Sequence, residues 1–303
     1  MKRNLIQAVA FLAAGMLSLG TVFAQSAQKQ QTFESFSSIS VSGDFQVTLT
    51  PGSEYAATLT VDQACMPYVQ CFVSSGTLIV TVGKLPKEVK KLYRGKNKPS
   101  YYVVITAPKL GGVSLSDNAT LMGTGNFTAD QFKLDLAGRS QVRHLTVEDA
   151  ASADVTLSKN AIAELNLDAD RISAGTSGSS SLRLQFSAES LALQAHGSST
   201  LSATGDTGTT ALTADGSSKV SLSGNSEESI AFSTAGSTSV DALACKTPKA
   251  DVVMTGGTVV EAASEALKLE LSGRSSLIFD HDPVIEIVSV KTSSINHYGA
   301  STR

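Results

Sequence analysis

The sequence predicts an all-β protein, a right-handed, single-stranded parallel β-helix with about 20 residues per coil. Three observations lead to this fold class. A turn-centred pattern of apolar positions recurs at nearly constant spacing, each copy contains two stretches of strand-like alternation, and small residues dominate a chain of 303 residues that has no Trp. Such a composition cannot build one large aromatic core, but it can fill a narrow core of stacked layers.

The N-terminus has the pattern of a secretory signal peptide over residues 1–24. A basic start is followed by the apolar stretch from Leu5 to Phe23 and by a small-residue exit at Ala24. The alternative is an uncleaved membrane anchor, for which the stretch is barely long enough. Cleavage would leave about 279 residues without a transmembrane segment, exported to the periplasm, the outer surface or the extracellular space. A short linker is expected at 25–32 and a single domain at 33–303.

The repeat is clearest around Gly216. Leu212 and Ala214 stand four and two positions before it, Val220 and Leu222 stand four and six positions after it, and polar residues lie between them. This is strand alternation, a turn residue, and strand alternation again. The same slots recur with the turn residue at Gly43, Asp117, Gly138, Lys159, Gly178, Gly197, Gly236, Gly256 and Gly273.

The turn slot suits residues that accept positive φ. Glycine does so without strain, and Asp117 and Lys159 are each followed by Asn, which also tolerates left-handed backbone. His144 occupies the last apolar slot after Gly138, so a register shift is expected there that brings Leu145 inside. A propeller blade needs about 40–45 residues, so the shorter period favours coils of a β-helix.

Residues 84–98 (KLPKEVKKLYRGKNK) interrupt the repeat. They contain seven basic residues against the single Glu88, and a short helix is expected from near Pro86. We name this segment the basic excursion. It is the most favourable place for an anionic ligand or a glycan, and the candidate ligand-binding residues are Lys90, Lys91, Tyr93, Arg94, Tyr101 and Tyr102. The alternatives are a solvated loop, and a strand opened by Tyr101 and Tyr102 with one ring buried and one exposed.

Residues 283–303 are expected to form a C-terminal cap. This stretch remains apolar, with Val284, Ile285 and Ile287 among its residues, but it no longer keeps the slots. An uncovered parallel edge would recruit other chains, so a segment that covers the last coil is the expected role.

The three cysteines, Cys65, Cys71 and Cys245, cannot all pair within one chain. Three buried thiols are the simpler interpretation, and a bridge between Cys65 and Cys71 is the alternative, because export would permit it. The net charge of −3 argues against nucleic acid as a partner of the whole molecule. The sequence leaves the oligomeric state open.

Several segments together resemble a known family. The domain opens with Phe33-Glu34-Ser35-Phe36-Ser37-Ser38-Ile39-Ser40-Val41-Ser42-Gly43 and continues with Val47-Thr48-Leu49-Thr50-Pro51-Gly52, Leu59-Thr60-Val61-Asp62, Gly76-Thr77-Leu78-Ile79-Val80 and Val104-Ile105-Thr106-Ala107-Pro108-Lys109-Leu110 before the Gly-Ser-Ser repeats. Over about residues 33–280 the chain resembles the putative auto-transporter adhesin, head GIN domain family of exported bacterial proteins. The resemblance implies a β-helix-like fold, a location beyond the inner membrane, and no catalytic residues shared across the family.

A catalytic site is not predicted. Asp168 and Asp170 share a strand face, but acidic residues are otherwise dispersed, whereas glycoside cleavage needs carboxylates that face each other. The run Asp280–Asp282, with His281 at its centre, is expected to be a turn rather than a metal site, and His196 a solvated residue on an outward face. No metal and no cofactor are predicted.

The expected function is that of a non-catalytic envelope or cell-surface binding protein, an adhesin of a glycan or another surface polymer. The first alternative is a carbohydrate-active enzyme, a polysaccharide lyase or hydrolase on a β-helix. The second is a purely structural envelope component without a ligand. The fold does not choose between them, because β-helices support all three.

Overall fold

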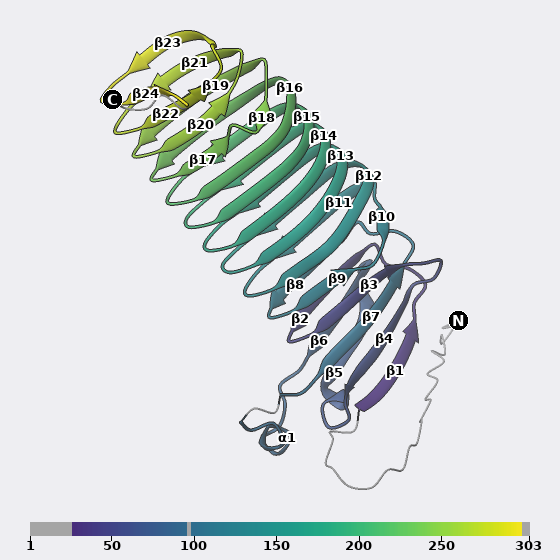
Figure 1. Ribbon diagram of the computed structural model, residues 1–303. Coiled ribbons are helices and arrows are strands. Elements are labelled where there is room, and N and C mark those ends of the chain that lie inside the picture. The colour runs from purple at the N-terminus through teal and green to yellow at the C-terminus, as the bar shows by residue number, and fades with distance from the viewer. Residues whose placement is uncertain (1–25, 96–97, 299–303) are drawn as a thin grey trace.

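In the computed structural model, which describes residues 26–95 and 98–298, the chain forms an elongated β-solenoid (Figure 1). The predicted parallel β-helix is confirmed: about ten coils lie on one another, about 20 residues apart in sequence. The predicted signal peptide at 1–24 lies outside the described residues.

The regular part of the solenoid begins after the basic excursion. Its strands are β8 (Gly112–Asp117), β9 (Thr120–Gly123), β10 (Asn126–Thr128), β11 (Gln131–Leu136), β12 (Gln141–Leu157), β13 (Ile162–Thr176), β14 (Ser181–Ala195), β15 (Thr200–Ala214), β16 (Lys219–Gly236), β17 (Ser239–Ala242), β18 (Cys245–Lys246), β19 (Lys249–Gly256), β20 (Val259–Ala263), β21 (Ala266–Leu271), β22 (Ser276–Asp280), β23 (Val284–Val290) and β24 (Ser294–His297). The long strands β12 to β16 each bend at a corner opposite the glycine turns, so one strand contributes to both faces of its coil.

The N-terminal part is less regular. It comprises β1 (Ser26–Thr32), β2 (Ser38–Gly43), β3 (Gln46–Pro51), β4 (Ala56–Asp62), a 3-10 turn (Met66–Tyr68), β5 (Val69–Ser74), β6 (Thr77–Val82), α1 (Lys87–Leu92) and β7 (Tyr101–Ala107).

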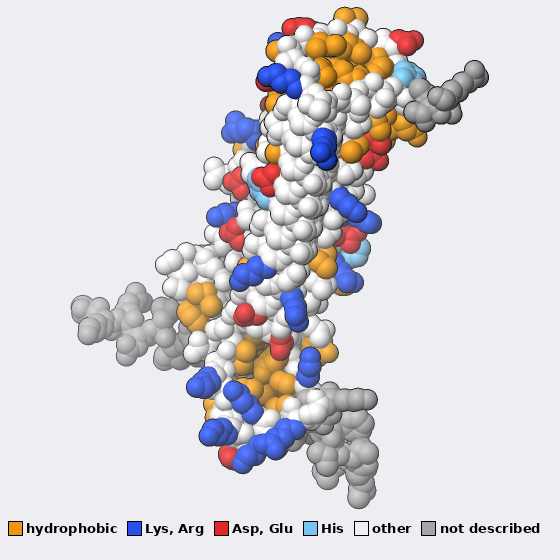
Figure 2. Space-filling view, turned by 90° about the vertical axis from the view of Figure 1, so that its left-hand side faces the viewer, with side chains coloured by type: hydrophobic (Ala, Val, Ile, Leu, Met, Phe, Trp, Pro, Cys, Tyr) orange, Lys and Arg blue, Asp and Glu red, His pale blue; other side chains and the backbone are white. Residues whose placement is uncertain are grey.

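The predicted turn slots stack into one line along the rod, which we name the turn column. All ten predicted slot residues take positive φ, including the non-glycine residues Asp117 (60°) and Lys159 (65°). Stacking makes glycine necessary at most of them: a Cβ on Gly216 would lie 2.6 Å from the carbonyl oxygen of Gly197 in the preceding coil. Figure 2 looks onto this side of the rod, where a band of uncharged polar side chains and backbone runs between the charged residues.

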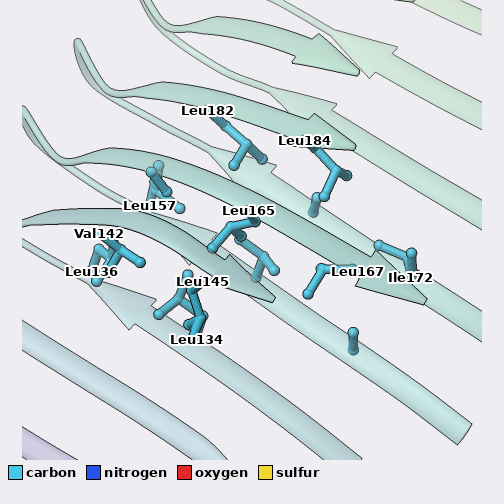
Figure 3. Packing of buried hydrophobic residues seen from close by; sticks show 14 of the residues in the cluster. Leu134, Leu136, Val142, Leu145, Leu157, Leu165, Leu167, Ile172, Leu182 and Leu184 are labelled. Carbon is cyan, nitrogen blue, oxygen red and sulfur yellow. The ribbon is translucent and has the colours of Figure 1, made fainter. Parts of the chain in front are cut away.

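The core follows the apolar slots. Leu136 lies beside Leu157 of the next coil, and Leu165 lies beside Leu184, so leucines stack along the axis (Figure 3). Burying one such side chain contributes about 1.5–3 kcal/mol. The register shift expected at His144 is confirmed: His144 takes a positive φ of 52°, and Leu145 is buried opposite Leu165.

A ladder of buried hydroxyls accompanies the turn column, which the sequence analysis did not anticipate. It occupies the second position after the turn residue and consists of Ser140, Ser180, Ser199, Ser218, Thr238, Thr258 and Ser275. Some of these hydroxyls form hydrogen bonds with neighbouring residues. The hydroxyl of Ser180 donates to the carbonyl of Ser177 (2.9 Å), and the hydroxyl of Ser199 accepts from the hydroxyl of Thr176 (3.0 Å). Only small side chains occupy these buried positions, as close packing of the interior allows.

The N-terminal end departs from the predicted single winding. The coil formed by β2 and β3 is covered on one side by β8 and β9, and on the other by β6 and β7. Gly43 therefore lies opposite Asp117, although about sixty residues between these coils fold elsewhere. Beyond β6 and β7 the pairing becomes antiparallel, with β5 on β6, β4 on β7 and β1 on β4. Antiparallel strands need only short connections, so this end closes without further coils.

The expected linker at 25–32 was wrong, because residues 26–32 form β1, an edge strand paired with β4. This strand could not be recognised from the sequence, because most of its residues are polar on both faces. Its inner positions hold Ala27, Lys29 and Gln31, with Lys29 opposite Leu59. An inward-pointing charge on an edge strand discourages pairing with other chains.

The C-terminal segment, for which a cap over the last coil is predicted, continues the parallel winding by one further coil. β23 pairs in parallel with β21, and β24 pairs in parallel with β22. A bulge between Ile287 and Ser289 and a turn residue at Thr292 (φ 57°) hide the slot pattern. We name β23 and β24 the terminal coil.

Cys65, Cys71 and Cys245 are buried free thiols. Burial raises the pKa of Cys71 to about 11, with nearby Lys29 opposing the rise, and it raises the pKa of Cys245 to about 11, with Asp206 adding to it. Within residues 26–95 and 98–298, no helix is long and apolar enough to cross a membrane.

Candidate functional site

The basic excursion replaces the tight turn between β6 and β7. In every regular coil the corresponding connection is a turn-column residue with its neighbours, whereas here it contains the six-residue helix α1. Figure 1 shows α1 projecting from the N-terminal end of the rod. The helix expected near Pro86 is confirmed from Lys87, with Pro86 directly before it.

Apolar side chains attach the excursion to the rod. Leu85, Val89 and Tyr93 pack against the hydrophobic core, spaced four residues apart as one side of a helix requires. The basic residues between them are exposed, and so is Leu92. The excursion is thus a small amphipathic element with its cations turned to solvent. Figure 2 shows Lys and Arg side chains around a hydrophobic area at this lower end.

The excursion concentrates positive charge on an otherwise acidic chain. It carries seven basic residues and one acidic residue, while the other 288 residues carry 17 basic and 26 acidic ones. Glu88 is already engaged, since it accepts hydrogen bonds from Lys91 at 2.8 and 2.9 Å. Clustered cations of one sign raise the local concentration of anions, and the effect decreases with salt.

A buried polar cluster holds the base of the excursion. Asp62, at the end of β4, accepts hydrogen bonds from the hydroxyl (3.0 Å) and the backbone N–H (3.3 Å) of Ser100, directly before β7. Burial and hydrogen bonding to Cys65 raise the pKa of both Tyr93 and Tyr101. These tyrosines stay neutral at physiological pH.

The predicted ligand residues divide into two groups. Lys90, Lys91 and Arg94 are exposed together on the excursion, as a ligand surface needs. Tyr101 is buried, 3% exposed and packed on Phe45 (ring centroids 5.2 Å apart), so its place in a ligand surface was wrong.

The other two tyrosines also differ in their surroundings. Tyr93 is half-buried at the base of the excursion, and Tyr102 is exposed on the outer face of β7. The alternative that Tyr101 and Tyr102 open a strand, one buried and one out, is confirmed, because alternation along β7 sends neighbours to opposite faces.

A groove that the sequence analysis missed lies near the C-terminal end. It has a volume of about 570 Å³, and corner segments of four successive coils line it. Its lining includes the ionisable residues Glu227, Glu265, Asp282, Lys246 and His281 together with the apolar Pro248 and Ala263. These residues are far apart in sequence, and only the stacking of coils brings them together.

The other polar residues considered as sites are the Asp168 and Asp170 pair and the run from Asp280 to Asp282. Asp168 and Asp170 are exposed and line a shallow pocket of about 300 Å³ together with Asp149. The expected turn at Asp280–Asp282 is confirmed, with the backbone N–H of His281 donating to Asp280 (2.9 Å). In the part of the chain that the structure describes, no group of three or more His, Cys, Asp or Glu side chains could hold a metal ion.

His196 lies on the outward face of the rod, as predicted. Its ring is partly exposed, and Nδ1 lies 2.8 Å from a carboxylate oxygen of Asp215 in the next coil. The pair joins two adjacent coils at the surface.

Family comparison agrees with the repeat. The model of a family described as putative auto-transporter adhesin, head GIN domain, matches residues 35–185 and again residues 171–283. The chain belongs to this family. The two matches together span both the irregular N-terminal part of this head GIN domain and its regular coils. A search of curated proteins gave no match.

Solved structures similar to this chain include three proteins from Parabacteroides. A putative adhesin from Parabacteroides distasonis superposes with a TM-score of 0.51 at 14% identity, over 90% of this chain and 97% of that one. A putative adhesin from Parabacteroides merdae gives 0.44 at 16% identity, over 90% and 96%. A putative lipid binding protein from P. distasonis gives 0.49 at 14% identity, over the same shares. At these identities the likeness concerns the fold alone.

Proposed function

We propose that this head GIN domain is a non-catalytic, exported binding protein, an adhesin whose basic excursion binds an anionic surface polysaccharide. One observation carries the proposal. The excursion turns its cations to solvent and is fixed to the rod by Leu85, Val89 and Tyr93, on a chain whose remaining residues carry a net negative charge. Family membership supports the adhesin class, and the signal-peptide pattern at 1–24 supports export.

The binding test replaces cations without disturbing the anchors. In a variant with Lys87, Lys90, Lys91 and Arg94 all changed to Gln, the helix-forming tendency is kept. We expect binding to an immobilised polyuronate to weaken about ten-fold or more, and the wild-type affinity to fall steeply with salt. A matched control changes four exposed basic residues elsewhere on the rod to Gln, namely Arg139, Arg183, Lys219 and Arg274.

Equal binding by the excursion variant and the control would remove the excursion from the proposal. Binding to anionic lipid vesicles, with none to polyuronate, would replace the polysaccharide by a membrane surface. Export has its own measurement: the secreted or periplasmic protein should begin at Gln25, and an N-terminus at Met1 in a membrane fraction would contradict cleavage.

The C-terminal groove favours a second candidate, carbohydrate cleavage. Glu227, Glu265 and Asp282 surround one cavity, and glycoside hydrolysis uses two carboxylates that flank the scissile bond. A panel of polysaccharides assayed for new reducing ends or unsaturated uronate tests it. Turnover that disappears in Glu265→Gln, or in Asp168→Ala on the other acidic surface, would establish an enzyme in place of the binding protein.

A further inference from the structure

The terminal coil leaves the hydrophobic core open at one end of the rod. β23 and β24 each pair with the preceding coil on one edge, and no strand within residues 26–95 and 98–298 pairs with the other edge. Val284, Ile287 and Val288 are 77%, 58% and 55% exposed. Figure 2 shows the resulting hydrophobic area at the upper end.

Three of the partly or largely exposed apolar residues of β23 belong to the core by their register. Ile285, Ile287 and Val290 lie opposite Leu267, Leu269 and Leu271 of the preceding coil, which are all buried. One more β-layer would bury the terminal coil in the same way. Solenoid proteins normally end in repeats with a polar outer face, so an apolar end of this size marks a contact surface.

The other end of the rod is a poor match for this surface. A head-to-tail contact that continued the winding would bring β23 against β5 and β24 against β1. The inner positions of β1 hold Lys29 and Gln31. A charged side chain would then lie beside Ile295 of β24. The apolar end of a second copy has no such residue in its inner positions.

The charges on the terminal coil are self-complementary. When two copies of β23 pair in antiparallel fashion with Ile287 opposite Val290 of the other copy, Glu286 falls opposite Lys291 of the other copy, twice in the symmetric contact. Opposite charges directly across an antiparallel pair are favourable, and like charges are unfavourable. A register with Ile285 opposite Ile287 would instead place Glu286 opposite Glu286.

We propose that the terminal coil is a dimerisation surface, on which β23 pairs antiparallel with β23 of a second copy of this chain around a two-fold axis. The contact is isologous, so it closes at two copies and does not propagate into a filament. Because the basic excursion lies at the far end of each rod, the dimer carries one excursion at each of its two ends.

The first experiment measures the mass of the purified protein in solution by sedimentation. We expect a dimer for the wild type and a monomer for Ile287→Lys, with unchanged far-UV circular dichroism. The matched control is Val253→Lys, an exposed apolar residue on the outer face of β19, which should remain dimeric. A monomeric wild type, or a dimeric Ile287→Lys variant, would overturn the proposal.

The second experiment tests the register through disulfide formation. The double variant Glu286→Cys, Lys291→Cys should form a covalent dimer on oxidation, while either single variant should not, because only residues 286 and 291 of different copies are opposed. The three native cysteines are buried and so should not interfere. A dimer without this cross-link would overturn the proposed pairing even if the masses agree.

Discussion

The two ends of this solenoid differ in how they treat the unpaired edge of the outermost coil. At the N-terminal end, antiparallel strands β1, β4 and β5 close the stack, and the edge strand β1 turns Lys29 inward. At the C-terminal end of the described residues, β23 keeps the parallel pairing and exposes apolar side chains. Each parallel coil that is added has an unpaired edge like that of the coil before it. The stack is therefore closed only by a change in strand pairing or by polar residues on the last edge.

The largest expected contrast is in stability. Leu59 on β4 is buried beneath β1, so Leu59→Ala should lower the free energy of unfolding by about 3 kcal/mol through lost burial and a cavity. Ile287→Ala on the exposed terminal coil should cost less than about 1 kcal/mol in the monomer at low concentration. Chemical denaturation followed by circular dichroism compares the two. Equal losses would mean that the terminal coil is as well covered as β4.

The turn column should respond differently near its two ends. A Cβ on Gly273 would lie 2.6 Å from the backbone nitrogen of Gly256, whereas on Gly43 its nearest neighbour is a methyl group of Val82 at 3.2 Å. Left-handed strain costs about 1–3 kcal/mol at either site. We therefore expect Gly273→Ala to lower the thermal midpoint more than Gly43→Ala, because only the former also displaces backbone. A larger loss for Gly43→Ala would contradict stacking as the reason for glycine.

Thiol titration should give the same pH dependence of stability at the N-terminal end, through Cys71, and in the later coils, through Cys245. Burial raises the pKa of Cys71 and Cys245 from 9.0 to about 11, so the unfolded chain loses these protons first. The contribution of each thiol is constant below about pH 9 and is lost between pH 9 and 11, at up to about 1.4 kcal/mol per pKa unit. Unfolding at pH 8 and 10.5 in the wild type and in Cys71→Ala and Cys245→Ala measures it.

Lys29 supplies the internal control for that titration. Its charge opposes the rise in the pKa of Cys71, so Lys29→Met should raise that pKa further and slow alkylation of Cys71. Cys245, which lies beside Asp206 in a later coil, should react at an unchanged rate. A slower Cys245 would show that the variant alters the whole fold.

The smallest expected effect on stability concerns the edge itself. Lys29→Leu replaces an inward charge opposite Leu59 with an apolar side chain, so the free energy of unfolding should change by less than about 1 kcal/mol. Self-association should nevertheless increase, because β1 loses its protection as an edge strand. Sedimentation of this variant beside Gln28→Leu, an outward position on the same strand, checks that the inward position matters.

The sequence by itself determined the regular part of this protein. Alternation and turn chemistry are local properties of the chain. The apolar slots around Gly216 and its equivalents therefore predicted the coil and the turn column, and the polar His144 in an apolar slot predicted the register shift. The exposed cations at Lys90, Lys91 and Arg94 could also be found, because a break in a strict repeat is visible along the chain.

Only the tertiary structure decided how the coils are ordered and ended. The stacking of β6 and β7 beneath β2 and β3, the burial of Tyr101 on Phe45, and the closing role of β1 depend on contacts between segments distant in sequence. The same holds for the groove around Glu265. A repeat specifies which residues face inward, because that follows from the period of a strand, but it contains no information on which segment covers an end.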